Sequence, residues 1–268
     1  MTVECQIEFK NIVYDQILVP IPRDRITSKT YRKGIFIIPP YNNKVSSVEL
    51  NPGQEYKLNF IAPNLPTEPP KTKGFLAQCL SNDERYTKWK MKNLGREIIP
   101  YQAADKKIVE KIGMFVKTKL NYSRDRDSYV YIDDLLLSDP ERHPLQDCLG
   151  YHSCLVGCLR SMRIPAVLDI GFRLTSQDNP HTWAWYFDRQ ENNWVWVDLN
   201  DRKDEVAFGP KGLGRVSMTF GTTHVIKDVP NFPDSTVSFI QYGLGKRRIE
   251  NTPPFTQANF KVVVNKQV

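Results

Sequence analysis

The stretch from Asp147 to Ala166, DCLGYHSCLVGCLRSMRIPA, constrains the fold of this chain more than any other. Apolar residues recur in it at steps of three and four, which is the spacing of one buried helix face. They are Tyr151, Leu155, Leu159 and Met162. The proline of Arg163-Ile164-Pro165 predicts the end of the helix, because the residue before a proline is disfavoured in the helical region. The stretch therefore predicts a core helix with Cys148 at its N-terminus.

A thiol at a helix N-terminus has a specific expected chemistry. Unpaired backbone N–H groups and the positive end of the helix dipole favour the thiolate, so we expect a lowered pKa for Cys148. Cys154 and Cys158 lie beside the apolar stripe, and we expect them to pack. Five cysteines, three of them on one helix, are not typical of a disulfide framework. Without a Cys-x-x-Cys or His-x-x-x-His pair, we expect no metal site.

A predicted hairpin further along the chain supplies a histidine and an aspartate. The strands His181–Phe187 and Trp194–Leu199 flank the turn Asp188–Asn193. Side chains alternate along a strand, so His181 and Asp198 share one face and lie diagonally from each other. An even-numbered turn predicts these cross-strand partners: Trp183 with Asp198, Trp185 with Trp196, and Phe187 with Trp194.

This arrangement favours a nucleophile, a base and a group that orients the base. A carboxylate that accepts one imidazole N–H fixes the tautomer, and the other ring nitrogen can take a thiol proton. We therefore expect a triad of Cys148, His181 and Asp198. The alternative interpretation is a core histidine with its aspartate under an aromatic cluster. Further candidates beside the triad are Gln146, Trp183 and Trp196.

Three motifs in this order resemble the transglutaminase-like superfamily, in the form of transglutaminase-like cysteine peptidases. The Cys-x-Gly-Tyr at Cys148 is followed, at the family's spacing, by an Arg-x-x-Gly-Ile-Pro-Ala-Arg-like turn that begins at Arg160. His181-Thr182-Trp183 is similar to the family's His-x-Trp strand, and Trp194–Asp198 is similar to its Trp-x-x-x-Asp strand end. The resemblance covers about residues 101 to 200 and implies the same triad.

The stretch departs from the family pattern at several positions. Arg163 replaces the usual glycine before Ile-Pro, and Asp147 replaces the frequent glycine before the cysteine. His152 stands where a small residue is usual. It could tune the thiol, but we favour a packed helix histidine. Gln146 could donate to an oxyanion beside the backbone N–H of Cys148, although we favour a solvated loop side chain.

The N-terminal part of the chain reads as β-structure. Short runs rich in valine, isoleucine, phenylalanine and tyrosine alternate with turn residues, which is typical of a small sandwich. The predicted strands are Gln6–Tyr14, Gln16–Pro20, Gly34–Ile38, Ser46–Leu50 and Tyr56–Ile61. We expect a β-rich domain over residues 1–65, a linker with a short helix over 66–100, and a catalytic domain over 101–268. The short helix is expected at Asp83–Lys92, and a longer one at Tyr101–Leu120.

Composition limits the possible partners. The formal net charge is +7, but the basic residues are dispersed and no nucleic-acid motif is present. No apolar run is long enough to span a bilayer, and no signal peptide is visible. Free thiols favour a reducing compartment, so we expect a cytoplasmic protein, although a removed leader is compatible with the sequence. The sequence does not indicate an oligomeric state.

The expected fold is α+β, an antiparallel sheet with the cysteine-bearing helix packed on it, preceded by the small β domain. The expected function is thiol-dependent acyl transfer at amide bonds of a peptide or protein, most simply hydrolysis, with amine transfer as a variant and no metal or organic cofactor. One alternative is a binding or scaffold protein that keeps the fold without activity. Arylamine acyl transfer is another, but its Arg-Gly-Gly-x-Cys signature is absent.

Overall fold

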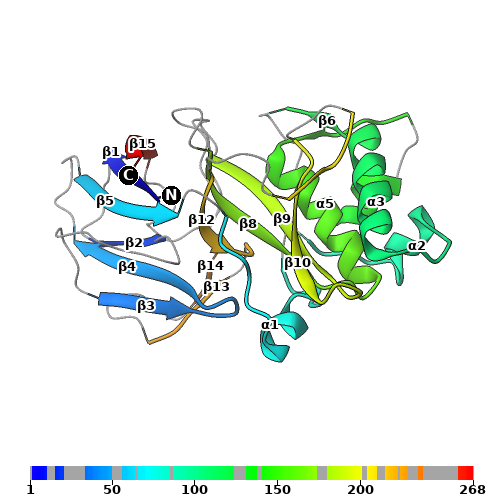
Figure 1. Cartoon of the computed structure of the whole chain (residues 1–268), viewed down its shortest axis with the longest axis horizontal. Coiled ribbons are helices and arrows are strands. Elements are labelled where there is room, and N and C mark those ends of the chain that lie inside the picture. Colours follow the sequence, from blue (N-terminus) through cyan, green and yellow to red (C-terminus); the bar gives the residue numbers. More distant parts are fainter. Residues whose placement is uncertain are drawn as a thin grey trace. The chain divides into compact units, whose positions relative to one another are not determined.

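The computed structural model describes residues 2–10, 16–20, 34–49, 56–63, 66–84, 87–123, 131–137, 141–173, 180–200, 204–209, 215–222, 224–228, 235–237 and 259–267. The chain divides into two compact units (Figure 1). The first unit comprises Met1–Thr67, Ile170–His181 and Gly212–Val268. The second unit comprises Glu68–Asp169 and Thr182–Lys211.

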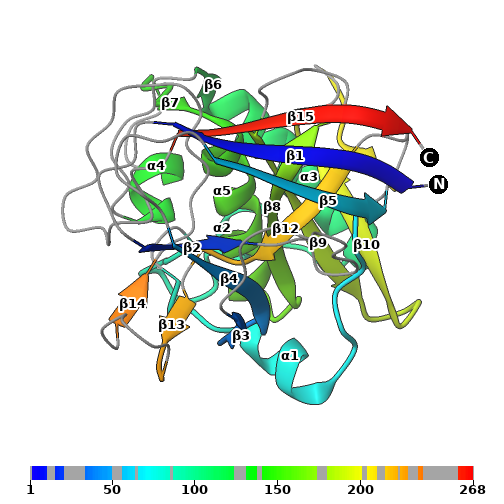
Figure 2. The ribbon, with the colours of Figure 1, turned by 90° about the vertical axis from the view of Figure 1, so that its left-hand side faces the viewer.

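The first unit is built from short antiparallel ladders. Strand β1 (Thr2–Lys10) lies between β5 (Tyr56–Pro63) and β15 (Asn259–Gln267), as Figure 2 shows. A second three-stranded sheet has the order β2-β4-β3. Its strands and those of a two-stranded sheet are β2 (Gln16–Pro20), β3 (Gly34–Ile38), β4 (Asn43–Glu49), β13 (His224–Ile226) and β14 (Ser235–Val237).

These strands confirm much of the N-terminal prediction. The bounds of β2 and β3 are those expected, and β4 and β5 differ from expectation by a few residues. The first strand begins at Thr2 rather than Gln6 and ends at Lys10. The pairing of β1 with β15 joins the first strand to one near residue 260, which local patterns could not predict. The sandwich arrangement and the predicted domain boundaries stay predictions, and the two units divide the chain differently.

The largest sheet of the described residues has five strands in the order β11-β10-β9-β8-β12. They are β8 (Ala166–Arg173), β9 (Pro180–Asp188), β10 (Asn193–Asp198), β11 (Ala207–Phe208) and β12 (Arg215–Phe220). The hairpin register is confirmed, because Trp185 pairs with Trp196 and Phe187 with Trp194. Asp188 closes the turn, since its carboxylate accepts hydrogen bonds from the backbone N–H groups of Gln190 and Glu191.

The helices belong to the second unit, and α5 (Cys148–Ser161) is the one that most of the others contact. The others are α1 (Lys73–Gln78), α2 (Leu94–Ile98), α3 (Asp105–Lys119) and α4 (Ile132–Leu137). Helices α2, α3 and α4 all contact α5. Figure 1 labels α2 and α3 beside α5, and Figure 2 labels α4. A Cβ at Gly157 would overlap Ile132, so this glycine lets α4 approach α5 closely. The short strands β6 (Asn121–Tyr122) and β7 (Leu145–Gln146) pair in parallel and lead into α5.

The α+β expectation and both long helices are confirmed. Helix α3 buries Ile108, Ile112 and Val116 as its periodicity predicts, but it begins at Asp105 rather than Tyr101. The helix expected at Asp83–Lys92 is wrong: the described residues of that segment form bends, a turn and irregular chain, and α2 starts after it. No helix within the described residues has the length and apolar character needed to cross a membrane.

Candidate active site

Helix α5 begins at Cys148 because Asp147 caps it. The Asp147 backbone is extended, and its carboxylate accepts from the N–H of Gly150 at 3.0 Å. Aspartate is among the preferred N-cap residues because its side chain satisfies one of the free N–H groups of the first turn. Asp147 therefore fixes the start of the helix and with it the position of Cys148.

The thiol of Cys148 is sheltered, although the residue as a whole is only half-buried. Burial raises its pKa to about 12, and the charges of Asp147 and Asp198 also raise it. Hydrogen bonds from the backbone and the side chain of Thr182 act in the opposite direction but do not outweigh burial. The expected lowering of the pKa is therefore wrong for this structure. Desolvation is the largest cause of the raised pKa, and the resting group is a protonated thiol.

Asp198 ends β10 and is fully buried. Its Oδ1 accepts from the backbone N–H of Asn200 at 2.8 Å and lies 3.4 Å from Nε2 of His152. Because the charge of Asp198 acts on the thiol of Cys148, these two predicted site residues lie near each other in the second unit.

The structure shows polar contacts of His152 that the sequence did not predict. The side chain is fully buried. Its Nδ1 lies 2.7 Å from the carbonyl oxygen of Cys148, and its Nε2 lies 2.9 Å from the backbone nitrogen of Leu199. The preference for a packed helix histidine is right about burial but misses these polar contacts. The signal in the sequence was that a histidine stands at position 152, where the superfamily that the chain resembles usually has a small residue.

His181 is also buried, on β9. It belongs to the segment Ile170–His181 of the first unit, where its Nε2 lies 2.8 Å from Nη2 of Arg173. A guanidinium only donates, so this nitrogen accepts and the ring proton sits on Nδ1. The next residue along β9 is Thr182, which belongs to the second unit and holds the thiol of Cys148. Sequence reasoning did not identify Arg173.

Two tryptophans of the hairpin donate to one buried carboxylate. Asp169 of β8 accepts through Oδ2 from the indole N–H of Trp183 at 2.8 Å and from that of Trp185 at 2.9 Å. The shared acceptor confirms that these two indoles lie on the same face of β9. Trp196 is buried as well. Trp183 thus acts as a donor within the core, which explains its burial without a direct role in chemistry.

Gln146 is fully buried on β7, two residues before Cys148. The preference for a solvated loop side chain is therefore wrong. Within the described part of the chain, neither atom of its side-chain amide makes a hydrogen bond. A buried amide without a partner costs free energy, and such groups are uncommon in folded proteins. Gln146 is therefore an available donor close in sequence to the candidate nucleophile.

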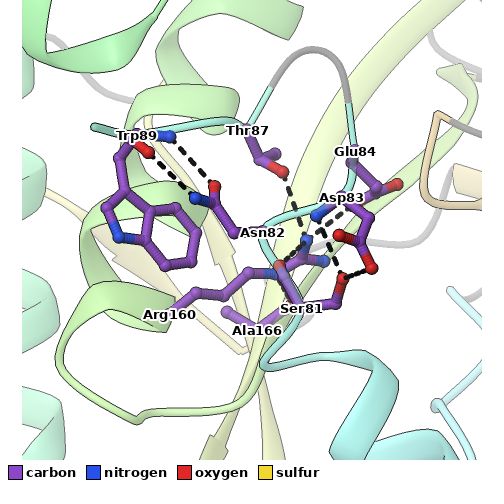
Figure 3. A network of polar contacts seen from close by, with 8 residues as sticks. All are labelled: Ser81, Asn82, Asp83, Glu84, Thr87, Trp89, Arg160 and Ala166. Atoms are coloured by element: carbon purple, nitrogen blue, oxygen red, sulfur yellow. Dashed lines mark hydrogen bonds and ion pairs between the residues drawn. The ribbon is translucent and has the colours of Figure 1, made fainter.

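The far end of α5 is held by the buried guanidinium of Arg160, the arginine of the motif quoted above (Figure 3). Its Nε donates to the carbonyl oxygen of Ala166 at 2.8 Å, and its Nη1 lies 2.7 Å from Oε2 of Glu84. The same Nη1 donates to Ser81 and Thr87. These bonds connect the helix to the start of β8 and to Ser81, Glu84 and Thr87, and they give Arg160 a structural role.

The other cysteines with described side chains lie in the second unit. Cys79, Cys154 and Cys158 are free and fully buried, and burial raises the pKa of each thiol. The packing role expected for Cys154 and Cys158 is consistent with this. Among the described residues, no group of three or more histidine, cysteine, aspartate or glutamate side chains could hold a metal ion.

No family model and no curated protein sequence matches the chain. Several solved structures resemble it at low identity. A cysteine protease candidate from Cytophaga hutchinsonii is 12% identical with a TM-score of 0.44, over 98% of this chain and 95% of that one. The periplasmic domain of TgpA from Pseudomonas aeruginosa is 12% identical with a TM-score of 0.46, over 74% of this chain and 69% of that one. A protease candidate from Parabacteroides distasonis is 13% identical with a TM-score of 0.32, over 76% of this chain and 45% of that one.

Proposed function

We propose that this chain is a transglutaminase-like thiol enzyme that transfers acyl groups from amide bonds through Cys148, His181 and Asp198. The observation that carries the proposal is the pair of hydrogen bonds from Thr182 to the thiol of Cys148. Thr182 follows His181 directly on β9, so this contact brings the strand of the proposed base to the proposed nucleophile. Because neighbouring side chains of a strand point to opposite faces, it does not by itself bring the imidazole there. The influence of the Asp198 charge on the same thiol supports the third member.

The proposed chemistry starts from a neutral thiol, because the pKa of Cys148 is raised to about 12. His181 removes the thiol proton as the sulfur attacks the amide carbonyl, and the same proton then goes to the leaving amine. The carbon–sulfur bond forms, the carbon–nitrogen bond breaks, and a thioester remains on Cys148. Water completes hydrolysis and restores the thiol; an amine in place of water gives a new amide.

Gln146 is the proposed oxyanion donor. Its buried amide has no hydrogen bond within the described residues, so its N–H groups are available to an oxygen that becomes negative in the transition state. Together with the backbone N–H of Cys148, it would stabilise the tetrahedral intermediate. Donors that are already desolvated and fixed in place need no reorganisation when the charge develops.

The proposed substrate is a peptide or protein, and no metal or organic cofactor takes part. Hydrolysis is the simpler outcome, since it needs only water as acceptor. The four free cysteines of the described residues are compatible with the proposed reducing, cytoplasmic location.

A scaffold protein without activity is the second candidate. Two observations favour it: the thiol is protonated at rest, and Arg173 donates to Nε2 of His181. The hydrogen bond between Arg173 and His181 would have to break before the base could act through Nε2. A binding role would instead use both histidine and thiol as buried structural groups.

Mass spectrometry of the wild type and Cys148→Ala with a peptide library and an amine probe separates these functions. Hydrolysed peptides and amine adducts have different masses, so one experiment distinguishes water from amine as acceptor. We expect products from the wild type and none from Cys148→Ala. Cys154→Ala is the matched control, because it removes a buried thiol from the same helix. Products that persist in Cys148→Ala would contradict the mechanism, and a wild type without products would favour the scaffold.

A further inference from the structure

The imidazole of His152 bridges two backbone segments that carry site residues. At one end, Nδ1 lies 2.7 Å from the carbonyl oxygen of Cys148, in the first turn of α5. At the other end, Nε2 lies 2.9 Å from the nitrogen of Leu199, the residue after Asp198, and 3.4 Å from Oδ1 of Asp198 itself. All these groups belong to the second unit.

The partners of the ring determine its protonation. A carbonyl oxygen only accepts hydrogen bonds, so Nδ1 of His152 carries the proton and donates to Cys148. A backbone N–H only donates, so Nε2 is unprotonated and accepts from Leu199. Both nitrogens of the ring are therefore in use. The ring could take a proton from the thiol only by giving up the bond to Leu199, which separates its role from that of the base.

We propose that His152 is a positioning residue, which holds the first turn of α5 and the end of β10 at a fixed separation. This inference rests on the proposed function, because it assigns His152 to the placement of Cys148 and Asp198. A planar ring is well suited to the task, since its two nitrogens cannot move relative to each other. The backbone of Asn200 also holds the end of β10, because its N–H donates to Oδ1 of Asp198 at 2.8 Å.

The site would be affected by the loss of the ring in a specific way. Without His152, the buried N–H of Leu199 and one acceptor position on the carbonyl of Cys148 would lose their partner. The first turn would then be free to shift. Because burial is the main cause of the raised pKa of Cys148, a shift that lets water reach the sulfur would lower that pKa. Thiol reactivity would rise while catalysis, which needs fixed geometry, would fall.

Three substitutions at position 152 test the two halves of the bridge. His152→Ala removes both. The amide nitrogen of His152→Asn replaces Nδ1 and retains the contact with Cys148 alone. The longer amide of His152→Gln reaches the position of Nε2 and can accept from Leu199. Ser153→Ala is the matched control, because Ser153 is the next residue of α5 and is equally buried, and its hydroxyl makes no hydrogen bond to the described residues.

The first measurement is the rate of alkylation of each cysteine by iodoacetamide at about pH 9, followed by mass spectrometry. In His152→Ala we expect Cys148 to react about 10-fold faster, which corresponds to a pKa lowered by about one unit. Cys154 and Cys158 are buried further along the same helix and report unfolding, so their rates should not change. In His152→Gln and Ser153→Ala, we expect Cys148 to stay within about 3-fold of the wild type.

The second measurement is turnover of a peptide that the wild type cleaves. We expect kcat of His152→Ala to fall about 10- to 100-fold with KM little changed, and His152→Gln to restore most of it. The inference is overturned if Cys148 reacts at the wild-type rate in folded His152→Ala, if all three cysteines of α5 accelerate together, or if His152→Gln behaves like His152→Ala. Alkylation needs no substrate, so it decides the role of His152 even if the wild type cleaves no peptide and the proposed function fails.

Discussion

Thr182 holds the sulfur of Cys148 through both its backbone and its side chain. Both hydrogen bonds act to lower the pKa of the thiol, against the larger effect of burial. The strand after His181 therefore supports the anionic form of the sulfur, which is the form that attacks a carbonyl. Replacement of the hydroxyl alone separates the contribution of the side chain from that of the backbone.

We predict that Thr182→Val slows alkylation of Cys148 about 5-fold, because a net hydrogen bond contributes about 1 kcal/mol. Valine keeps the shape of threonine and leaves the backbone N–H in place. Turnover should fall by a similar factor. Thr182→Ser keeps the hydroxyl and should remain close to the wild type. Faster alkylation in Thr182→Val would show that the hydroxyl does not stabilise the thiolate.

The pH dependence of Cys148 follows from its raised pKa. A thiol with a pKa of about 12 is protonated throughout the neutral range, so its thiolate fraction grows with every step in pH. We predict that the alkylation rate rises about tenfold per pH unit between roughly pH 7 and pH 10, without a plateau. A rate that is already maximal near neutral pH would contradict this, because it would indicate a thiolate paired with a protonated imidazole.

Gln146→Met should affect stability and activity in opposite directions. Methionine has a similar volume but no amide, so it removes a buried group that has no hydrogen bond to the described residues. We expect the free energy of unfolding to rise by about 1 kcal/mol. We expect kcat to fall about 100-fold, as for the loss of an oxyanion donor. Thermal denaturation and peptide turnover measure the two effects, and unchanged turnover would remove Gln146 from the site.

Arg163→Gly should stabilise the chain. Arg163 has φ 63°, in the left-handed region, at the end of α5. The N–H of Ile164 reaches back to the carbonyl of Leu159 at 3.0 Å, as in a helix ending that normally uses glycine. Because glycine adopts this conformation without a steric cost, we expect a gain of about 0.5–1 kcal/mol in thermal denaturation. Arg163→Ala keeps a Cβ and should give no such gain. An equal gain in both variants would show that the left-handed backbone conformation of Arg163 does not cause the effect.

Arg160→Met should destabilise the second unit strongly. It leaves Glu84, which is almost fully buried, without the guanidinium 2.7 Å away (Figure 3). Removal of one partner of a buried ion pair costs about 3–5 kcal/mol. The double variant Arg160→Met with Glu84→Met removes both charges and should recover much of the loss. Chemical denaturation measures each variant, and a double variant no more stable than Arg160→Met would show that the guanidinium acts mainly through its backbone acceptors.

Local patterns determined much of the candidate site. An apolar period and a proline predict α5 and the position of Cys148, because these effects act between residues within a few positions of each other. The same holds for the hairpin, since the length of its turn fixes the partner of Trp185 as Trp196. The family motifs add the order of Cys148, His181 and Asp198, which stays a prediction.

Only the tertiary structure decided how these groups are surrounded. The sequence predicts a lowered pKa for Cys148, but burial among distant segments raises it to about 12. Nothing near His152 in sequence indicates that its ring meets Leu199, 47 positions away. Gln146 reads as a loop residue and is fully buried. Periodicity reports which face of a helix or strand is apolar, whereas desolvation and hydrogen-bond partners depend on segments that folding brings together, and local patterns do not encode these.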